Sequence, residues 1–235
     1  MNVFVAGATG AIGRRLTPLL TEAGYTVDAF TRDPEKARAL EAAGVRASVG
    51  DVFDAAALRA AMARVQPALV AHQLTDLPQS RDERGDPAAL ARNARIRVEG
   101  TRNLIDAALA CGAQRILAQS IAFAYAAGPE PHAEGDPLDA DTRSSVITLE
   151  RLVLASPPLI GTVLRYGSLY GPGTWFDEPS GNVPVHVDAA ALATLLAITR
   201  VATGVFNVAE ERGYADCSRA RTELGWDPDA RLPPG

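Results

Sequence analysis

Three glycines near the N-terminus have the spacing of a loop that can hold phosphate groups. Gly7, Gly10 and Gly13 follow the apolar run Asn2–Ala6 directly and open a stretch of helical length. Gly7 allows a tight turn, Gly10 lets a pyrophosphate approach the backbone, and Gly13 lets the helix pack closely on the strand. The helix N-terminus then offers free N–H groups to the phosphates. The residues expected to contact a dinucleotide are Gly7, Thr9, Gly10, Ala11, Ile12 and Gly13.

The end of the second apolar run indicates which dinucleotide this loop would bind. An acidic residue there accepts hydrogen bonds from the adenosine ribose of NAD, whereas an arginine pairs with the 2′-phosphate of NADP. This chain has Phe30-Thr31-Arg32, and its first carboxylate, Asp33, precedes a proline as a helix N-cap. Arg32 therefore favours NADP over NAD. The alternative is a solvated arginine beside the helix cap.

The glycine loop belongs to a chain in which short apolar runs alternate with amphipathic stretches of helical length. This alternation is typical of a parallel sheet covered by helices, so the predicted fold class is α/β. Asp33, Asp54 and Asp188 are helix start signals, and Asp86–Ala110 is the longest expected helix. Gly and Pro cluster in residues 127–137 and 171–184, which predicts loops above the sheet. The expected strands are Asn2–Ala6, Thr26–Phe30, Val45–Val49, Ala68–His72, Arg115–Gln119 and Ile160–Arg165.

Composition excludes several classes of function. The chain has 235 residues, of which 47% are hydrophobic and 22% charged, the balance of a folded globular protein. A net charge of −5 gives no general attraction to nucleic acid or to anionic membranes. The longest apolar stretch, Ala189–Ile198, is too short to span a membrane, and three histidines and two separated cysteines lack metal-ligand spacing. We expect a cytoplasmic protein without metal, nucleic-acid or membrane partners.

Motifs spread over nearly the whole chain carry a family resemblance. In chain order they are GATGAIG at residues 7–13, GDV at 50–52, VEGTRNL at 98–104, RYGSLYGPG at 165–173 and FNV at 206–208. Together they resemble the extended short-chain dehydrogenase/reductases, which include the NAD(P)-dependent epimerases and dehydratases. The resemblance implies a Rossmann-type, doubly wound parallel sheet. It also implies an NAD(P)-binding domain over residues 1–165 and a reduced substrate-side segment, residues 166–235, packed on the same domain.

The resemblance also assigns binding roles. Asp51 and Val52 would contact the adenine of the cofactor, and the turn at His72 and Gln73 would pass near the nicotinamide. Relatives often dimerise through two long helices that correspond to residues 86–110 and 144–155, which implies a homodimer.

The chain departs from the family at the catalytic pair Tyr-x-x-x-Lys, in which the lysine lowers the pKa of the tyrosine. Its single lysine, Lys36, cannot belong to such a pair. When Glu150 is aligned with the glutamate that commonly follows the pair, Thr142 stands where the tyrosine belongs and Val146 where the lysine belongs.

Two residues remain as candidates for the catalytic roles. Ser120 lies one residue before the usual serine position, which Ile121 occupies, and a one-residue offset in a strand points a side chain to the other face. Ser120 recovers the role if the strand has already ended. Tyr125, in the loop beyond, is the remaining acid/base candidate. A packing aromatic at the strand end is the alternative interpretation.

The substrate side is shortened. Only residues 174–185 separate Gly173 from His186, where sugar-using members have a longer substrate-binding segment. Trp175 and Phe176 would line a small apolar pocket, and the alternative is that these aromatic side chains shield the surface. The main hypothesis is an atypical NAD(P)-dependent oxidoreductase acting on a small carbonyl or alcohol, with protonation from Tyr125, Ser120 or water. The alternatives are a non-catalytic NADP(H)-binding sensor or regulatory protein, and a redox-neutral isomerase or lyase on the same fold.

Overall fold

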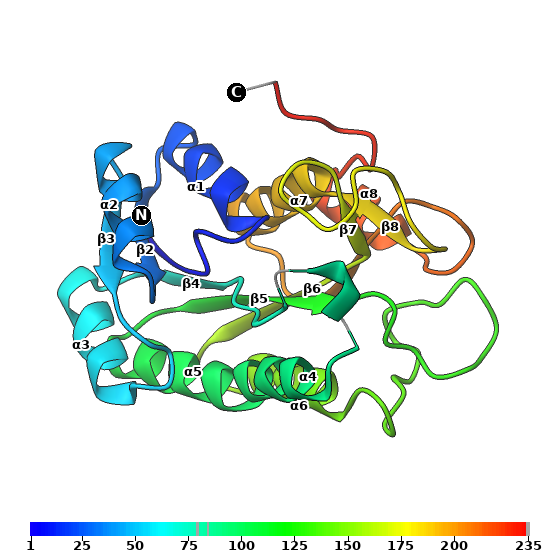
Figure 1. The fold of residues 1–235 in the computed structure, drawn as a ribbon, viewed down its shortest axis with the longest axis horizontal. Coiled ribbons are helices and arrows are strands. Elements are labelled where there is room, and N and C mark those ends of the chain that lie inside the picture. The colour runs from blue at the N-terminus through cyan, green and yellow to red at the C-terminus, as the bar shows by residue number, and fades with distance from the viewer. Residues whose placement is uncertain (79, 84, 234–235) are drawn as a thin grey trace.

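A seven-stranded parallel sheet runs through the middle of the structure, a computed structural model that describes residues 1–78, 80–83 and 85–233 (Figure 1). The strand order is β3-β2-β1-β4-β5-β6-β9, and every neighbouring pair is parallel. The order reverses between β1 and β4, which is the switch point of a doubly wound fold. The predicted Rossmann-type α/β fold is therefore confirmed. The strands are β1 (Asn2–Ala6), β2 (Thr26–Thr31), β3 (Arg46–Val49), β4 (Leu69–His72), β5 (Arg115–Ile121), β6 (Ile160–Tyr166) and β9 (Gly204–Val208).

The first six of these strands begin and end within two residues of their predicted positions. The sequence analysis missed β9, whose run Gly-Val-Phe-Asn-Val contains a glycine and an asparagine and so lacks a continuous apolar pattern. Because β9 pairs with β6, residues 166–235 contribute a strand to the main sheet. The boundary at residue 165 falls inside β6, and the division into two parts stays a prediction.

Helices cover both faces of the sheet. Figure 1 shows α1 and α7 on one side and α3, α5 and α6 on the other, and each interface is filled by its own cluster of buried apolar side chains. A separate two-stranded sheet joins β7 (Ser168–Tyr170) to β8 (Pro184–His186). The helices are α1 (Gly13–Glu22), α2 (Pro34–Ala42), α3 (Ala55–Val65), α4 (Pro87–Arg95), α5 (Thr101–Ala110), α6 (Ser144–Leu154), α7 (Val187–Thr199) and α8 (Ser218–Leu224), with a 3₁₀ turn η1 (Arg81–Glu83).

Two of the three predicted helix caps are confirmed. The side chains of Asp33 and Asp54 accept N–H groups of the first turns of α2 and α3. The prediction for Asp188 was wrong, because α7 begins one residue earlier and His186 is its N-cap. Asp188 lies within the first turn instead, where its Oδ1 accepts a hydrogen bond of 2.5 Å from Nε of Arg15 on α1. The carboxylate of Asp188 therefore pairs with Arg15 and does not cap the helix.

The long helix predicted over residues 86–110 is interrupted. It consists of α4, a π turn η2 (Ile96–Gly100) and α5, which follow one another without a loop. A π turn inserts one extra residue, which rotates the side chains before it relative to those after it. Hydrophobic spacing cannot reveal such an insertion, since the stripes on either side each keep helical period. The extra residue therefore changes which side chains of the helix face the carboxyl edge of the sheet.

His72, the last residue of β4, is buried against α5. Its Nε2 lies 3.0 Å from Oγ1 of Thr101, and the N–H of Leu74 donates to its Nδ1 at 3.3 Å. Nδ1 is therefore the acceptor and Nε2 carries the proton. Burial lowers the pKa of His72 from its usual 6.5 to about 4, because the charged imidazolium would lose its hydration.

The pH dependence of stability tests this burial. Between pH 4 and 6.5 the unfolded chain protonates His72 and the folded protein does not, so folding stability is full above about pH 6.5 and falls as the pH drops toward 4. The expected loss from this group is on the order of 3 kcal/mol. Urea unfolding at several pH values gives the free energy of unfolding as a function of pH. Between pH 4 and 6.5 this free energy should change less steeply with pH in His72→Gln than in the unmodified protein. The same pH dependence of the unfolding free energy in both proteins would contradict the lowered pKa of His72.

Candidate functional site

The glycine turn after β1 fits tightly against the backbone that follows β4. Gly7 has a φ of +94°, and a Cβ at this position would lie 2.6 Å from the carbonyl carbon of Gln73. A Cβ on Gly13 would lie 2.2 Å from the carbonyl oxygen of Gly7. Gly10 differs, because the nearest protein atom to its Cβ would be 3.4 Å away and the residue is exposed. Packing thus requires glycine at positions 7 and 13, whereas at position 10 its absent side chain leaves room for a ligand.

The N-terminus of α1 is open for an anion. Its N-cap, Ile12, provides no side-chain hydrogen bond, and the first turn contains no acidic residue. The first N–H groups of the helix therefore lack a capping side chain and present partial positive charge. Thr9 and Ala11 are half-buried beside them. This combination of an uncapped helix and a side-chain-free Gly10 fits the pyrophosphate of a dinucleotide.

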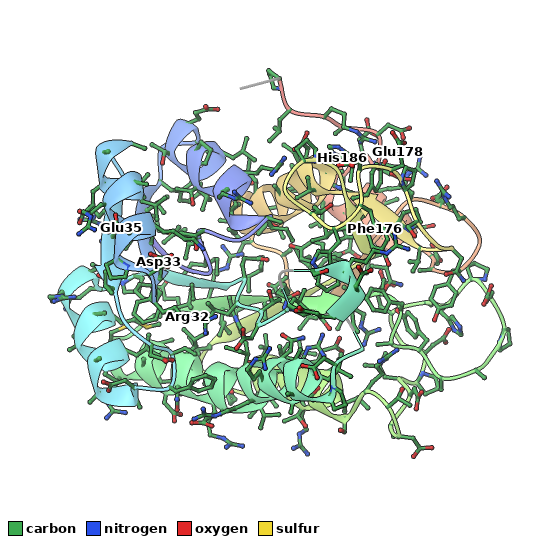
Figure 2. All side chains as sticks on the ribbon, in the orientation of Figure 1. Arg32, Asp33, Glu35, Phe176, Glu178 and His186 are labelled. Carbon is green, nitrogen blue, oxygen red and sulfur yellow. The ribbon has the colours of Figure 1, made fainter. Side chains whose placement is uncertain are left out.

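A cation stands at the end of β2. The side chain of Arg32 is 66% exposed, and its Nη2 lies 3.3 Å from Oδ1 of Asp76. The neighbouring carboxylate of Asp33 is occupied, because it accepts the N–H groups of Glu35 and Lys36, and the Lys36 N–H holds the pKa of Asp33 below its usual range. Figure 2 shows Arg32 and Asp33 where β2 meets α2. The exposed group that a ligand would meet there is the Arg32 guanidinium, which contacts Asp76 in this structure.

The segment after β3 is fixed at the same edge of the sheet. Asp51 is exposed and accepts the N–H of Phe53 at 2.9 Å. Val52 is buried, and its carbonyl oxygen accepts a hydrogen bond of 2.9 Å from Nδ2 of Asn103 on α5. These bonds hold Asp51 and Val52 in place, and their contact with an adenine ring stays a prediction.

The turn after β4 lies beneath the glycine loop. The N–H of Gln73 donates to the carbonyl oxygen of Ala6 at 2.8 Å, which joins the ends of β1 and β4. The Gln73 side chain is buried, and neither of its polar atoms has a hydrogen-bond partner among the described residues. The His72 imidazole is occupied by Thr101 and Leu74, as described above. The role of His72 and Gln73 in binding the nicotinamide stays a prediction.

The structure brings Ser120 and Tyr125 into one buried network centred on Arg165. Oγ of Ser120 donates to Oε1 of Glu150 at 2.6 Å, and Arg165 donates to both oxygens of Glu150 at 2.9 and 2.6 Å. Arg165 Nη1 also donates to the Tyr125 hydroxyl at 2.9 Å, and that hydroxyl donates to Oδ1 of Asn207 at 2.7 Å. All five side chains are buried. The two predicted catalytic residues are thus tied to the same ion pair.

These contacts limit what the Tyr125 phenol can do chemically. Burial raises its pKa above the usual value of 10, so the hydroxyl keeps its proton at neutral pH. A family tyrosine needs the opposite shift, which a neighbouring lysine supplies. The ring of Tyr125 also stacks on His132, with centroids 4.7 Å apart. Catalysis by Ser120 or Tyr125 stays a prediction, and the described contacts are those of a structural network.

The positions of the family pair carry groups of another kind. Thr142 is exposed and its hydroxyl donates to Asp139 at 2.6 Å, while Val146 is buried. Neither supplies a phenol or an ammonium group. The ion pair of Arg165 with Glu150 is not predicted by the motif in which Arg165 stands. A charged residue inside an apolar strand is the signal that could have revealed it, since such a residue is buried only when paired.

Two loops meet above the sheet. Nε1 of Trp175 donates to the carbonyl oxygen of Pro78 at 3.2 Å, and the guanidinium of Arg81 lies 4.7 Å from the centroid of the Phe176 ring. Arg15 on α1 also contacts the second loop, because its Nη2 donates to the carbonyl oxygen of Pro172 at 2.8 Å. Trp175 and Phe176 therefore contact the segment after β4, and a small apolar pocket at these two residues stays a prediction.

The described part of the chain contains no group of three or more His, Cys, Asp and Glu residues arranged to hold a metal ion. Nor does any helix among the described residues have the length and apolar character needed to cross a membrane.

Comparison with known proteins places the chain in a family. Residues 7–170 match a family model described as NAD(P)H-binding. The chain is 41% identical over 239 residues to the 3-diazoavenalumate denitrifying reductase of a Streptomyces species, a match that covers 90% of this chain and 76% of that protein. A shorter match, 40% identical over 68 residues, relates 29% of this chain to 24% of the NAD(P)H azoreductase of Xenophilus azovorans.

Solved structures agree with the observed architecture. The UDP-glucose 4-epimerase of Stenotrophomonas maltophila, crystallised with NAD, superposes with a TM-score of 0.80 at 19% identity, covering 98% of this chain and 94% of that one. At this identity the likeness shows the fold, including the dinucleotide-binding half. The chain therefore belongs to the NAD(P)H-binding family and is an NAD(P)-dependent oxidoreductase.

Proposed function

We propose that this protein uses NADPH to reduce a diazo compound, with an aryl diazonium ion as the reacting form. One observation carries the proposal: a chain 41% identical to a diazo-compound reductase has Thr142 and Val146 at the positions of the family's proton-donating pair. The substrate class comes from that relative's name and the missing pair supports it. A small carbonyl or alcohol is the competing substrate class.

The two substrate classes differ in their need for a proton. A carbonyl that accepts hydride becomes an alkoxide, and its protonation by a positioned acid is worth roughly 10²–10⁴-fold in rate. An aryl diazonium ion that accepts hydride becomes a neutral diazene, which loses N₂ and leaves the arene. Aryl diazonium ion and NADPH thus give arene, N₂ and NADP⁺, with no net proton taken up. A site without the tyrosine and lysine is suited to the second reaction.

The chain's own residues would hold the cofactor, which supplies the hydride when bound. The α1 N-terminus and Gly10 would face the pyrophosphate, and Arg32 would pair with a 2′-phosphate after leaving Asp76. The occupied carboxylate of Asp33 supports NADP over NAD, because a carboxylate that already accepts two backbone N–H groups is less available to the ribose hydroxyls.

Replacing Arg32 tests the choice of cofactor. Arg32→Ala should weaken NADPH binding about 10-fold or more, since a charge-assisted hydrogen bond contributes about 1.5–3 kcal/mol. NADH binding should stay within twofold. Titrations that follow energy transfer from tryptophan to the reduced nicotinamide measure both constants. Arg64→Ala, at the exposed C-terminal end of α3, is the control. Equal losses of affinity for NADPH and NADH would show that Arg32 does not select between the two cofactors.

The reaction itself can be measured directly. With NADPH and benzenediazonium, the protein should release one N₂ per NADPH oxidised, well above the protein-free rate. Benzaldehyde should react at least about 100-fold more slowly, because it needs the missing acid. An azo dye tests reduction at a nitrogen–nitrogen double bond. Faster reduction of benzaldehyde or of the dye than of the diazonium ion would refute the proposal.

Tyr125→Phe separates a structural role from proton donation. Removing the hydroxyl leaves Arg165 and Asn207 short of a buried partner, so the free energy of unfolding should fall by about 1–3 kcal/mol. Diazonium turnover should stay within twofold. Tyr214→Phe, a half-buried neighbour of the same ring cluster, is the matched control. A 100-fold loss of turnover at unchanged stability would instead establish Tyr125 as the proton donor.

A further inference from the structure

Arg97 lies on the π turn just beyond the carboxyl edge of the sheet. Thr101, four residues later, contacts His72 at the carboxyl end of β4 and so fixes the height of the helix at that edge. The π turn, Ile96–Gly100, therefore continues past the strand ends, and it packs against α6. Ligands of doubly wound folds bind outside the carboxyl ends of the strands, beside the switch point between β1 and β4. The π turn that carries Arg97 thus lies at the edge of the sheet where such ligands bind.

The guanidinium of Arg97 has no counter-ion in the described part of the chain. It is half-buried and takes part in no hydrogen bond or ion pair there. Its charged neighbour is another cation, Arg143, and burial together with that neighbour lowers the pKa of Arg97. The nearby carboxylate of Glu99 is occupied by Arg95 at 2.7 and 3.0 Å. A partly desolvated cation without a partner is costly unless a ligand supplies the negative charge.

Arg143 and the start of α6 add to this positive region. Arg143 is the N-cap of α6, provides no side-chain cap, and is followed by a first turn without an acidic residue. The uncapped N–H groups of this turn contribute partial positive charge. Arg143 itself faces Asp139, whose carboxylate accepts the Thr142 hydroxyl. Arg97 is therefore the member of this region that has no acid opposite it.

We propose that Arg97 binds a carboxylate of the substrate, so that the protein acts on carboxylated aryl diazonium ions. This inference rests on the function proposed above and specifies its substrate. A guanidinium matches a carboxylate in bidentate geometry, and one unpaired arginine balances one negative charge. The carboxylate also removes an electrostatic obstacle, because a bare Arg97 repels the cationic diazonium group.

Paired substrates test this assignment. The unmodified protein should reduce 4-carboxybenzenediazonium with a kcat/KM at least 10-fold above that for benzenediazonium. Arg97→Gln should abolish this preference without lowering the rate with benzenediazonium, because the repulsion of the diazonium group is removed together with the carboxylate site. Arg97→Lys should keep part of the preference. Arg151→Gln, an exposed arginine in the last turn of α6, is the matched control. Equal losses for both substrates, or no loss for either, would overturn the role of Arg97.

A binding measurement separates this inference from the proposed reaction. With NADP⁺ bound, benzoate should bind at least 10-fold more tightly than benzamide, and Arg97→Gln should equalise the two without changing NADPH affinity. Benzoate selectivity without any diazonium reduction would refute the reaction and keep the Arg97 site. If the protein reduces diazonium ions but benzoate does not bind, or binds equally well to Arg97→Gln, the Arg97 site is refuted and the proposed reaction is kept.

Discussion

The close contact between the glycine turn and the turn after β4 is the constraint on which the site depends. Gly7 and Gln73 approach so closely that a single Cβ would collide with backbone, and Gly13 closes the turn against Gly7 in the same way. This packing joins β1, β4 and the start of α1 at the switch point of the sheet. The uncapped helix end and the open space at Gly10 follow from it, and together they fit a pyrophosphate.

A second buried element, the ion pair of Arg165 with Glu150, organises the carboxyl ends of β5, β6 and β9. A buried pair persists only when its remaining hydrogen-bonding capacity is met, and Ser120, Tyr125 and through it Asn207 meet it here. The hydroxyl groups of Ser120 and Tyr125, the two predicted catalytic residues, are thereby engaged in this buried network. This engagement favours a reaction that takes hydride and requires no proton from the protein.

Cations stand at both ends of the proposed active site. Arg32, after the end of β2, would meet a 2′-phosphate at the adenosine end, and Arg97, on the π turn, would meet the carboxylate of the proposed substrate. The two arginines differ in the free energy that the folded protein loses by removing their charge from water. Arg32 is exposed and hydrated, so it is tolerated without a ligand, whereas Arg97 has lost part of its hydration and gains more from an anion.

The sequence by itself determined the positions of six strands, the glycine turn and the absence of the catalytic pair, because hydrophobic period, glycine spacing and residue identity are local properties. It did not determine where the side chains of Ser120 and Tyr125 point, since that depends on partners 30 and 40 residues later in the chain, Glu150 for Ser120 and Arg165 for Tyr125. Nor did it reveal the π turn that carries Arg97, because the insertion leaves the period on either side unchanged. Tertiary structure decided these features, since a buried charge is placed by the partners that surround it and those partners come from distant segments.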